Sequence, residues 1–417
     1  MSLNNTPSAE RIHIGIFGRR NAGKSSIINA LTGQNLSIVS DIKGTTTDPV
    51  LKSMELLPLG PVVMIDTPGL DDEGELGALR IQKARQILNK TDIAVLVVDG
   101  TAGMSREDTE IFHTIRAKSI PCIIVLNKAD LVSESAMPAV LSSVTQRLAK
   151  CVPLPVMWVS TATRMNIEEL KERLSSLIPV PDTRLQIVGD LLKPSDLAVL
   201  VVPIDKAAPK GRLILPQQQT IRDILEAGAV SVVTRDTELK QTLASLGKPP
   251  ALVITDSQAF EQVAANVPED IPLTSFSILF ARYKGNLQSA VDGARTLDLL
   301  EDKDTILISE GCTHHRQCED IGTVKLPNFI RKHTGKELNF EFTSGTEFPL
   351  DLQKYRLIVH CGGCTLNERE MRYRQKCAED AKVPMTNYGI AIAHMKGILK
   401  RSISVFTRMN TPDGKDQ

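Results

Sequence analysis

The sequence is poor in aromatic residues and carries no excess of either charge. Its 417 residues include one tryptophan, and the 49 basic and 49 acidic side chains cancel. Without a net field, the chain has no electrostatic bias toward nucleic acid or an anionic membrane surface. No apolar run reaches the roughly 18 residues that a membrane-spanning helix needs. We therefore expect a protein that binds neither nucleic acid nor a membrane.

From the sequence we expect neither a signal peptide nor a disulfide framework. The first residues, MSLNNTPSAER, lack the basic and apolar regions of a signal peptide. Seven cysteines make an odd set, and two of them form a Cys-x-x-Cys pair, which suits a reducing compartment better than an oxidising one. We expect a cytoplasmic protein. A chain of this length allows two to four domains, each able to bury its own core.

A phosphate-binding loop follows the first predicted strand, at 12–17. Residues 18–25 read GRRNAGKS, and a helical pattern begins directly after them. This is the G-x-x-x-x-G-K-S motif in the strand-loop-helix setting that it requires. We expect Lys24 to reach the β- and γ-phosphate oxygens and Ser25 to bind Mg²⁺. The predicted phosphate-binding residues are Gly18, Asn21, Ala22, Gly23, Lys24, Ser25 and Ser26.

Two further motifs specify the nucleotide and its metal. The predicted strand 61–65 ends in Asp66-Thr67-Pro68-Gly69, where Asp66 can hold Mg²⁺ through water and the Gly69 amide can sense the γ-phosphate. The segment 127–130, Asn-Lys-Ala-Asp, resembles the guanine-reading motif of GTPases. We expect Asn127, Lys128 and Asp130 to bind the base, and the nucleotide to be GTP. Ser160 and Thr161 stand where such GTPases usually carry Ser-Ala.

The region between the first helix and the second strand resembles a particular branch of GTPases. Residues 44–48, Gly-Thr-Thr-Thr-Asp, are similar to the switch I loop of TrmE-like GTPases, a match that implies a Mg²⁺ contact for Thr46. Asn21 matches the asparagine with which potassium-stimulated members bind K⁺. Leu70 occupies the place of the glutamine that positions water in Ras-like enzymes. K⁺ could supply the positive charge of an arginine finger, and Glu75, or less favourably Asp72, could orient the water, although exposed carboxylates are more often simply solvated.

After the GTPase pattern, the prolines at 179 and 181 mark a linker. Beyond it, short continuous apolar strands alternate with helical stretches, which predicts parallel sheets. The middle part carries no catalytic constellation and is expected to be a dimerisation or interaction unit, or else a spacer. The predicted fold class is α/β, with three consecutive α/β domains, the first a P-loop GTPase fold and the others small, mostly parallel sheets flanked by helices. The predicted boundaries are a disordered tail at 1–10, a GTPase domain at 11–178, a linker at 179–188, an interaction domain at 189–268, a metal-binding domain at 272–405 and a polar tail at 406–417.

Cysteines and histidines at the ends of two strands in the third part predict a metal site. Cys312 and His314 follow the predicted strand 305–308, and His360, Cys361 and Cys364 follow the strand 357–359. The carboxyl ends of neighbouring parallel strands meet at one crevice. Thiolates select iron-sulfur clusters, zinc or cuprous ions. No fourth cysteine has a matching spacing, so the last position falls to a histidine, a water molecule or a partner's ligand.

Other interpretations of the seven cysteines remain open. A structural zinc knuckle or a set of buried, inert thiols would also explain the pair of segments. Cys122 and Cys151 lie beside apolar strands and are predicted to be core residues, whereas the roles of Cys318 and Cys377 are undecided.

The whole pattern resembles the HydF family, the maturation GTPases of FeFe-hydrogenase. The resemblance rests on a TrmE-like GTPase domain, an α/β middle part and a Cys-x-His and His-Cys-x-x-Cys pair, and the segment 274–285, TSFSILFARYKG, also looks like that family. It implies a 4Fe-4S cluster on Cys312, Cys361 and Cys364, with His314 and His360 as candidate fourth ligands.

The same resemblance implies a scaffold and carrier. The radical maturases HydE and HydG would supply a precursor of the diiron subcluster, and the hydrogenase apoprotein would receive it. A homodimer is expected. Two alternatives are a TrmE-like RNA-modification GTPase, which the near-zero net charge disfavours, and a GTP-regulated protein with a structural zinc domain.

Overall fold

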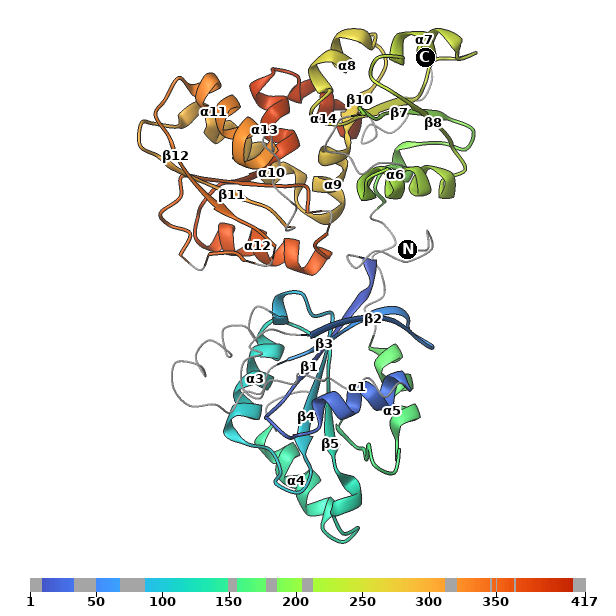
Figure 1. Ribbon diagram of the computed structural model, residues 1–417, viewed down its shortest axis with the longest axis vertical. Helices are drawn as coiled ribbons and strands as arrows, with labels where there is room; N and C mark the ends of the chain where they lie inside the picture. The colour runs from blue at the N-terminus through green and yellow to red at the C-terminus, as the bar shows by residue number, and fades with distance from the viewer. Residues whose placement is uncertain are drawn as a thin grey trace, which may run out of the picture. The chain divides into compact units, whose positions relative to one another are not determined.

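The computed structural model describes residues 10–33, 50–67, 87–148, 156–177, 186–204, 213–311, 321–345, 347–349, 351–363 and 365–407. The chain divides into two compact units, Met1–Pro181 and Asp182–Gln417 (Figure 1). Among the described residues, no helix has both the length and the apolar character that crossing a membrane requires.

The first unit is built on a six-stranded sheet in the order β2-β3-β1-β4-β5-β6, in which β2 alone runs antiparallel to its neighbour. The strands are β1 (Ile12–Phe17), β2 (Val50–Leu56), β3 (Gly60–Asp66), β4 (Ile93–Asp99), β5 (Cys122–Asn127) and β6 (Val156–Trp158). The helices are α1 (Lys24–Thr32), α3 (Arg106–Ala117), α4 (Met137–Arg147) and α5 (Ile167–Ser176), with a 3-10 turn η2 (Ala129–Leu131).

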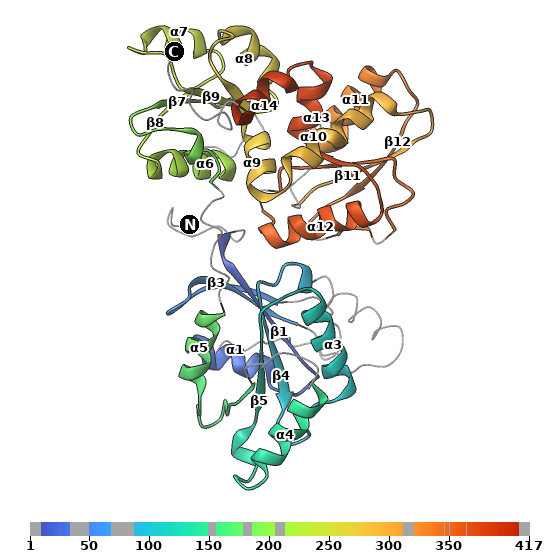
Figure 2. The same cartoon turned by 180° about the vertical axis from the view of Figure 1, so that it is seen from behind.

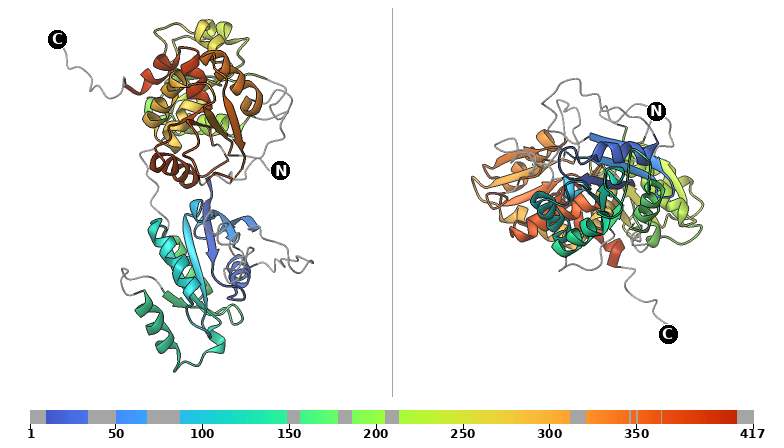
Figure 3. Two further views of the ribbon diagram at one scale, coloured as in Figure 1. Left: turned by 90° about the vertical axis from the view of Figure 1, so that its left-hand side faces the viewer. Right: turned by 90° about the horizontal axis from the view of Figure 1, so that it is seen from below.

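Helices cover both faces of this sheet (Figures 1 and 3). Alternate residues of β4 point to opposite faces: Val95 packs in one core cluster with α1 and α5, and Leu96 in another with α3 and α4. A parallel strand buried on both faces needs a continuous apolar run rather than an alternating one, and β4 supplies it with IAVLVVD. The predicted strands at 12–17 and 61–65 are β1 and β3, which lie side by side in this sheet.

The second unit contains two four-stranded parallel sheets, ordered β10-β9-β7-β8 and β12-β11-β13-β14. The strands are β7 (Leu197–Val201), β8 (Val230–Thr234), β9 (Leu252–Thr255), β10 (Leu273–Ser275), β11 (Thr305–Ser309), β12 (Asn339–Thr343), β13 (Leu357–His360) and β14 (Met385–Asn387). The helices are α6 (Leu215–Glu226), α7 (Leu239–Ser245), α8 (Phe260–Asn266), α9 (Phe276–Lys284), α10 (Leu287–Arg295), α11 (Leu326–Thr334), α12 (Glu368–Asp380), α13 (Tyr388–Met395) and α14 (Leu399–Thr407). The short helical turns are η3 (Gly189–Leu191), η4 (Thr296–Leu299) and the π-helical η5 (Ile321–Lys325).

The two sheets of this unit share buried helices. α13 is apolar nearly all round, as expected of a helix buried on every side. Its Ile390 packs in the core cluster of β7 and β9, while its Ile392 packs in that of β11 and β13. Figure 2 shows α13 and α14 at the junction of the two sheets. α14, the last helix, also packs on the middle sheet, because its Leu399 and Val405 belong to core clusters that contain residues of β7 and β9.

One boundary differs from the sequence-based expectation. The predicted boundary between the middle and last parts lies at 268–272, yet β10 pairs with β9 and extends the middle sheet to Ser275. The residues after β14 form two helices, α13 and α14, because Gly397 adopts a left-handed backbone with φ +71° and ends the first.

Candidate functional site

The phosphate loop needs glycine at two positions. Gly18 and Gly23 have φ angles of +138° and +93°. A Cβ on Gly18 would lie 2.1 Å from the carbonyl oxygen of Val97, and a Cβ on Gly23 would lie 2.1 Å from Nδ2 of Asn127. Side chains at these positions would clash with strands β4 and β5, so the motif glycines let the loop lie close to the sheet.

Lys24 and Ser25 occupy the start of α1. The Lys24 side chain is buried, and its Nζ donates to the carbonyl oxygens of Gly18 at 2.9 Å and Arg19 at 2.7 Å. The ammonium therefore lies within the curve of the loop, where the motif places it for the phosphates. Asn21 is exposed on the same loop with φ +61°, a conformation that asparagine tolerates better than most residues.

A hydroxyl and a carboxylate meet at the magnesium position. Ser25 Oγ donates to Oδ2 of Asp66 at 2.6 Å, bringing the end of β3 against the first turn of α1. Burial raises the pKa of Asp66, and the Ser25 hydrogen bond and the charges of Lys24 and Lys52 oppose the rise. Hydroxyl and carboxylate oxygens are the ligands that Mg²⁺ prefers, so these two residues fit the metal.

The predicted guanine-reading residues converge at the ends of β5 and β6. Asn127 is buried, and its Nδ2 donates to the carbonyl oxygen of Ala22 at 3.0 Å, which connects the base loop to the phosphate loop. Lys128 Nζ pairs with Asp99 at 2.5 Å. Ser160 Oγ donates to Oδ1 of Asp130 at 2.5 Å, which orients that carboxylate. Thr161 follows Ser160 on the same loop, and Ser26 is exposed on α1.

Several predicted site residues lie outside the residues that the structure describes. These are Thr46, Gly69, Glu75, Cys312, His314 and Cys364, together with Leu70, Asp72, Cys151 and Cys318.

Cys361 lies where β11 and β13 end side by side. Ser309 pairs with His360 in register, and the Cys361 amide donates to the Ser309 carbonyl oxygen at 2.9 Å. The Cys361 sulfur accepts backbone N–H groups from Gly311 at 3.0 Å and Gly363 at 3.4 Å. Such donors stabilise a thiolate and are typical around cluster sulfurs. The donor set therefore fits a metal or cluster ligand.

The backbone next to the other two cysteines lies around this sulfur. Gly311 directly precedes Cys312, and Gly363 directly precedes Cys364. Thr365 Oγ1 donates to the Gly311 carbonyl oxygen at 2.8 Å, so the two segments also contact each other. The ends of β11 and β13 thus bring Gly311 and Gly363 to the Cys361 sulfur, as the strand-end argument from the sequence predicts for this edge of the sheet.

His360, a predicted candidate ligand, is buried and hydrogen-bonded at both ring nitrogens. It is 1% exposed, its Nδ1 lies 2.7 Å from the Cys361 carbonyl oxygen and its Nε2 lies 3.0 Å from Nη1 of Arg374. Burial first, and the charge of Arg374 second, lower the pKa of His360 to about 3. Because arginine only donates, Nε2 must accept and Nδ1 carries the proton. Both ring nitrogens have partners in this structure, so His360 would have to give up one of these contacts to act as the predicted fourth ligand.

Arg374 is the centre of a buried network that the sequence did not reveal. Its guanidinium contacts Glu370 at 2.9 Å, Ser309 Oγ at 3.3 Å and the Gly345 carbonyl oxygen at 2.8 Å, besides His360. The i,i+4 spacing of Glu370 and Arg374 was visible in the sequence, but that spacing is common on exposed helices. Only the fold shows that this pair is buried. Arg374 contacts His360, which directly precedes the loop at 361–366, here called the cysteine loop.

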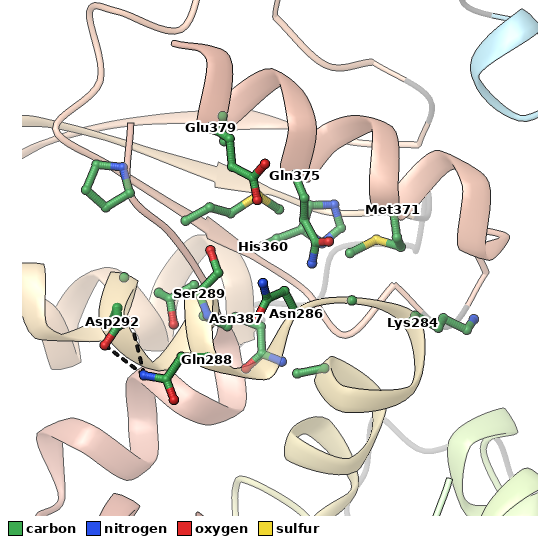
Figure 4. Close-up of a pocket in the computed structure, with 18 of the residues that line it drawn as sticks. Lys284, Asn286, Gln288, Ser289, Asp292, His360, Met371, Gln375, Glu379 and Asn387 are labelled. Atoms are coloured by element: carbon green, nitrogen blue, oxygen red, sulfur yellow. Dashed lines mark hydrogen bonds between the residues drawn. The ribbon is translucent and has the colours of Figure 1, made fainter. Parts of the chain in front are cut away.

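Lys284, in the ARYKG segment, supports the same loop from α9. Its side chain is 4% exposed, and Nζ donates to the carbonyl oxygens of Gly363 at 3.2 Å and Leu366 at 2.9 Å. A cavity of about 470 Å³ lies beside it, with Cys361 among its lining residues. Figure 4 shows Gln375 of α12 and Asn286 of the α9–α10 turn on opposite walls. The loop therefore borders a space large enough for a small molecule.

Family comparisons agree with the architecture. Residues 187–285 match the hydrogen maturase F dimerization domain, and residues 288–405 match the hydrogen maturase F tetramerization domain; together these matches cover more than half of the chain. The chain belongs to the hydrogen maturase F (HydF) family. Residues 13–128 match the family described as 50S ribosome-binding GTPase, so this HydF-family chain carries a GTPase domain of the P-loop class.

Curated relatives are similar over part of this chain. GTPase Der of Kosmotoga olearia is 32% identical over 181 residues, covering 42% of this chain and 41% of its own length. The tRNA modification GTPase MnmE of Desulfotalea psychrophila is 33% identical over 175 residues, covering 41% of this chain and 36% of its own. The HydF-family chain thus spans about two-fifths of the length of the relatives it matches.

Solved structures of similar proteins include Era of Aquifex aeolicus, bound to GDP and AlF4⁻. It is 20% identical, with a TM-score of 0.36, covering 54% of this chain and 92% of that one. A probable GTP-binding protein engB is 26% identical, with a TM-score of 0.34, covering 40% and 98%.

Proposed function

We propose that this HydF-family protein is a GTP-binding and GTP-hydrolysing scaffold of FeFe-hydrogenase maturation, which holds a 4Fe-4S cluster on Cys312, Cys361 and Cys364 and delivers the diiron subcluster precursor. The observation that carries the proposal is the Cys361 sulfur, which accepts N–H groups from the residues just before the other two cysteines. The radical maturases HydE and HydG would supply the cargo, and the hydrogenase apoprotein would receive it, in a reducing cytoplasm.

Structural zinc is the alternative to a cluster at these cysteines, and it needs a fourth protein ligand. In this structure both ring nitrogens of His360 have other partners, and Cys377, in α12, packs against the core cluster that contains Leu307 and Ile358. His314 remains the candidate for the fourth position. An imidazole is displaced more easily than a thiolate, so cargo could replace it without loss of the cluster.

The nucleotide site supports a regulatory role for GTP. The hydrogen bonds of Lys24 to Gly18, of Ser25 to Asp66 and of Ser160 to Asp130 support binding of the phosphates, of Mg²⁺ and of guanine at these residues. We infer that Thr46 and Gly69 contact Mg²⁺ and the γ-phosphate, and that Glu75 orients the attacking water. K⁺ bound at Asn21 would stimulate hydrolysis, which rates in potassium and sodium salts would test.

An exposed sheet edge supports a homodimer. β8 is an edge strand of the sheet that matches the dimerization domain, and its Val230 and Val233 are 46% and 47% exposed. Unpaired backbone groups beside exposed β-branched side chains form a template for a second strand. We infer that two copies pair through β8.

Anaerobic reconstitution with iron and sulfide tests the cluster. We expect about four irons per chain, from the 4Fe-4S stoichiometry, in a brown protein with a reducible cluster. Cys361→Ser should lose most of the iron, while Cys377→Ser, the matched control, should retain it. A colourless protein with one zinc per chain would refute the cluster.

Delivery is tested separately: the protein loaded by the radical maturases should activate hydrogenase apoprotein, and failure with an intact cluster would refute the carrier role.

A further inference from the structure

A carboxylate and two imidazoles from three separate elements meet at the surface of the second unit. Asp298 lies in η4, His333 in the last turn of α11 and His394 in the last turn of α13. Nε2 of His333 is 2.9 Å from Oδ1 of Asp298, and Nε2 of His394 is 2.8 Å from Oδ2. One ligand atom from each residue lies within 4.8 Å of the others. Three potential metal ligands therefore converge on one point.

We propose that Asp298, His333 and His394 bind a divalent first-row transition metal such as Zn²⁺, Co²⁺ or Fe²⁺. Two imidazoles and one carboxylate are a donor set that these ions share. The Asp298 side chain is 52% exposed, so water would complete the coordination. Nitrogen and oxygen donors also distinguish this site from the sulfur site at Cys361, with which it shares no residue.

The backbone beneath the three ligands is fixed by the core. Leu297, next to Asp298, is 1% exposed, Ile330, one turn before His333, is 0% exposed, and Ala393, next to His394, is 0% exposed. All three pack in core clusters of the unit. Metal binding therefore requires side-chain rotation only, and little ordering cost is added on binding.

The hydrogen bonds present without metal do not oppose binding strongly. His333 and His394 each bond to a different oxygen of one exposed carboxylate. Exposed ion pairs and hydrogen bonds of this kind contribute little to stability. A metal ion that inserts between the three side chains would replace weak contacts by coordinate bonds and would connect η4, α11 and α13.

Cobalt titration of the full-length chain tests the site. The cluster cysteines are first replaced (Cys312→Ser, Cys361→Ser, Cys364→Ser), so the result does not depend on the proposed cluster. We expect one equivalent of Co²⁺ to bind, with a d–d absorption band, and Zn²⁺ to displace it. His333→Gln, His394→Gln and Asp298→Asn should each weaken binding at least about tenfold. His113→Gln, at an exposed histidine of α3, is the matched control and should bind as the parent does.

An independent measurement covers the case of a variant that does not fold. In the parent chain, Zn²⁺ should slow the modification of His333 and His394 by diethyl pyrocarbonate, followed residue by residue with mass spectrometry, and leave His113 unaffected. Unchanged cobalt affinity in folded variants, or no protection of either histidine by zinc, would overturn the proposal.

Discussion

Lys284 is the residue through which α9 holds the cysteine loop. Replacing it with methionine keeps the length of the side chain and removes both hydrogen bonds, leaving the carbonyl oxygens of Gly363 and Leu366 without this donor. Each buried group that loses its partner costs about 1–3 kcal/mol. We expect Lys284→Met to lower the unfolding free energy by a few kcal/mol on this scale and to speed iron loss from the reconstituted cluster to a chelator.

Matched variants make this residue-scale prediction specific. Lys284→Arg keeps the charge and should retain more iron than Lys284→Met. Lys336→Met removes an exposed lysine of the same unit and should behave as the wild type does. If Lys284→Met released iron no faster than Lys336→Met, the lysine would have no part in holding the loop.

Cys122 is a core thiol, as the sequence predicted. It is 3% exposed, and burial raises its pKa to about 12, so it stays protonated.

At the scale of elements, the sequence predicts strands well where they are long and buried on both faces. β4, β7 and β11 are such strands, and their continuous apolar runs identify them. β12 was not predicted because it is an edge strand whose side chains are mostly exposed. β10 and β14 were missed because they are three residues long, and their pairing depends on neighbours distant in sequence. Local patterns thus indicate the central strands, whereas tertiary contacts decide the edges.

The packing of α14 on the middle sheet leads to an element-scale prediction. Val405 is 7% exposed and belongs to the same core cluster as Leu200 of β7 and Ile254 of β9. Val405→Ala should lower the unfolding free energy by about 2 kcal/mol through lost apolar burial and the cavity left behind. Urea unfolding measures this change, and Lys400→Ala, at an exposed position of the same helix, serves as the control. Equal midpoints for the two variants would contradict the packing.

At the scale of the whole molecule, the sequence identified the nucleotide site because its motifs are local, each lying in one loop beside one strand. It also predicts that the strands before Cys312 and Cys361 end at one edge of a sheet, and β11 and β13 do so, with Ser309 opposite His360. It does not reveal the contact between His360 and Arg374, since an imidazole beside a cysteine looks the same in sequence whether it binds metal or an arginine. Burial and partners decide that role, and both come from residues distant along the chain.

The nucleotide-binding residues lie in the first unit and Cys361 lies in the second. For the proposed carrier role, the central question is whether nucleotide binding in the first unit changes partner binding by the second. A nucleotide that orders switch loops can alter partner affinity, and such coupling is typically about 1–3 kcal/mol, or roughly 5- to 150-fold. We expect a non-hydrolysable GTP analogue to change the dissociation constant for the hydrogenase apoprotein by a factor in this range. By linkage, the apoprotein must change the affinity for the analogue by the same factor, so two titrations on the same proteins check each other. Lys24→Ala, which weakens phosphate binding, should abolish the shift but leave the nucleotide-free affinity intact. A shift that persists in Lys24→Ala, or equal affinities with and without the analogue in the wild type, would show that GTP does not control this partner.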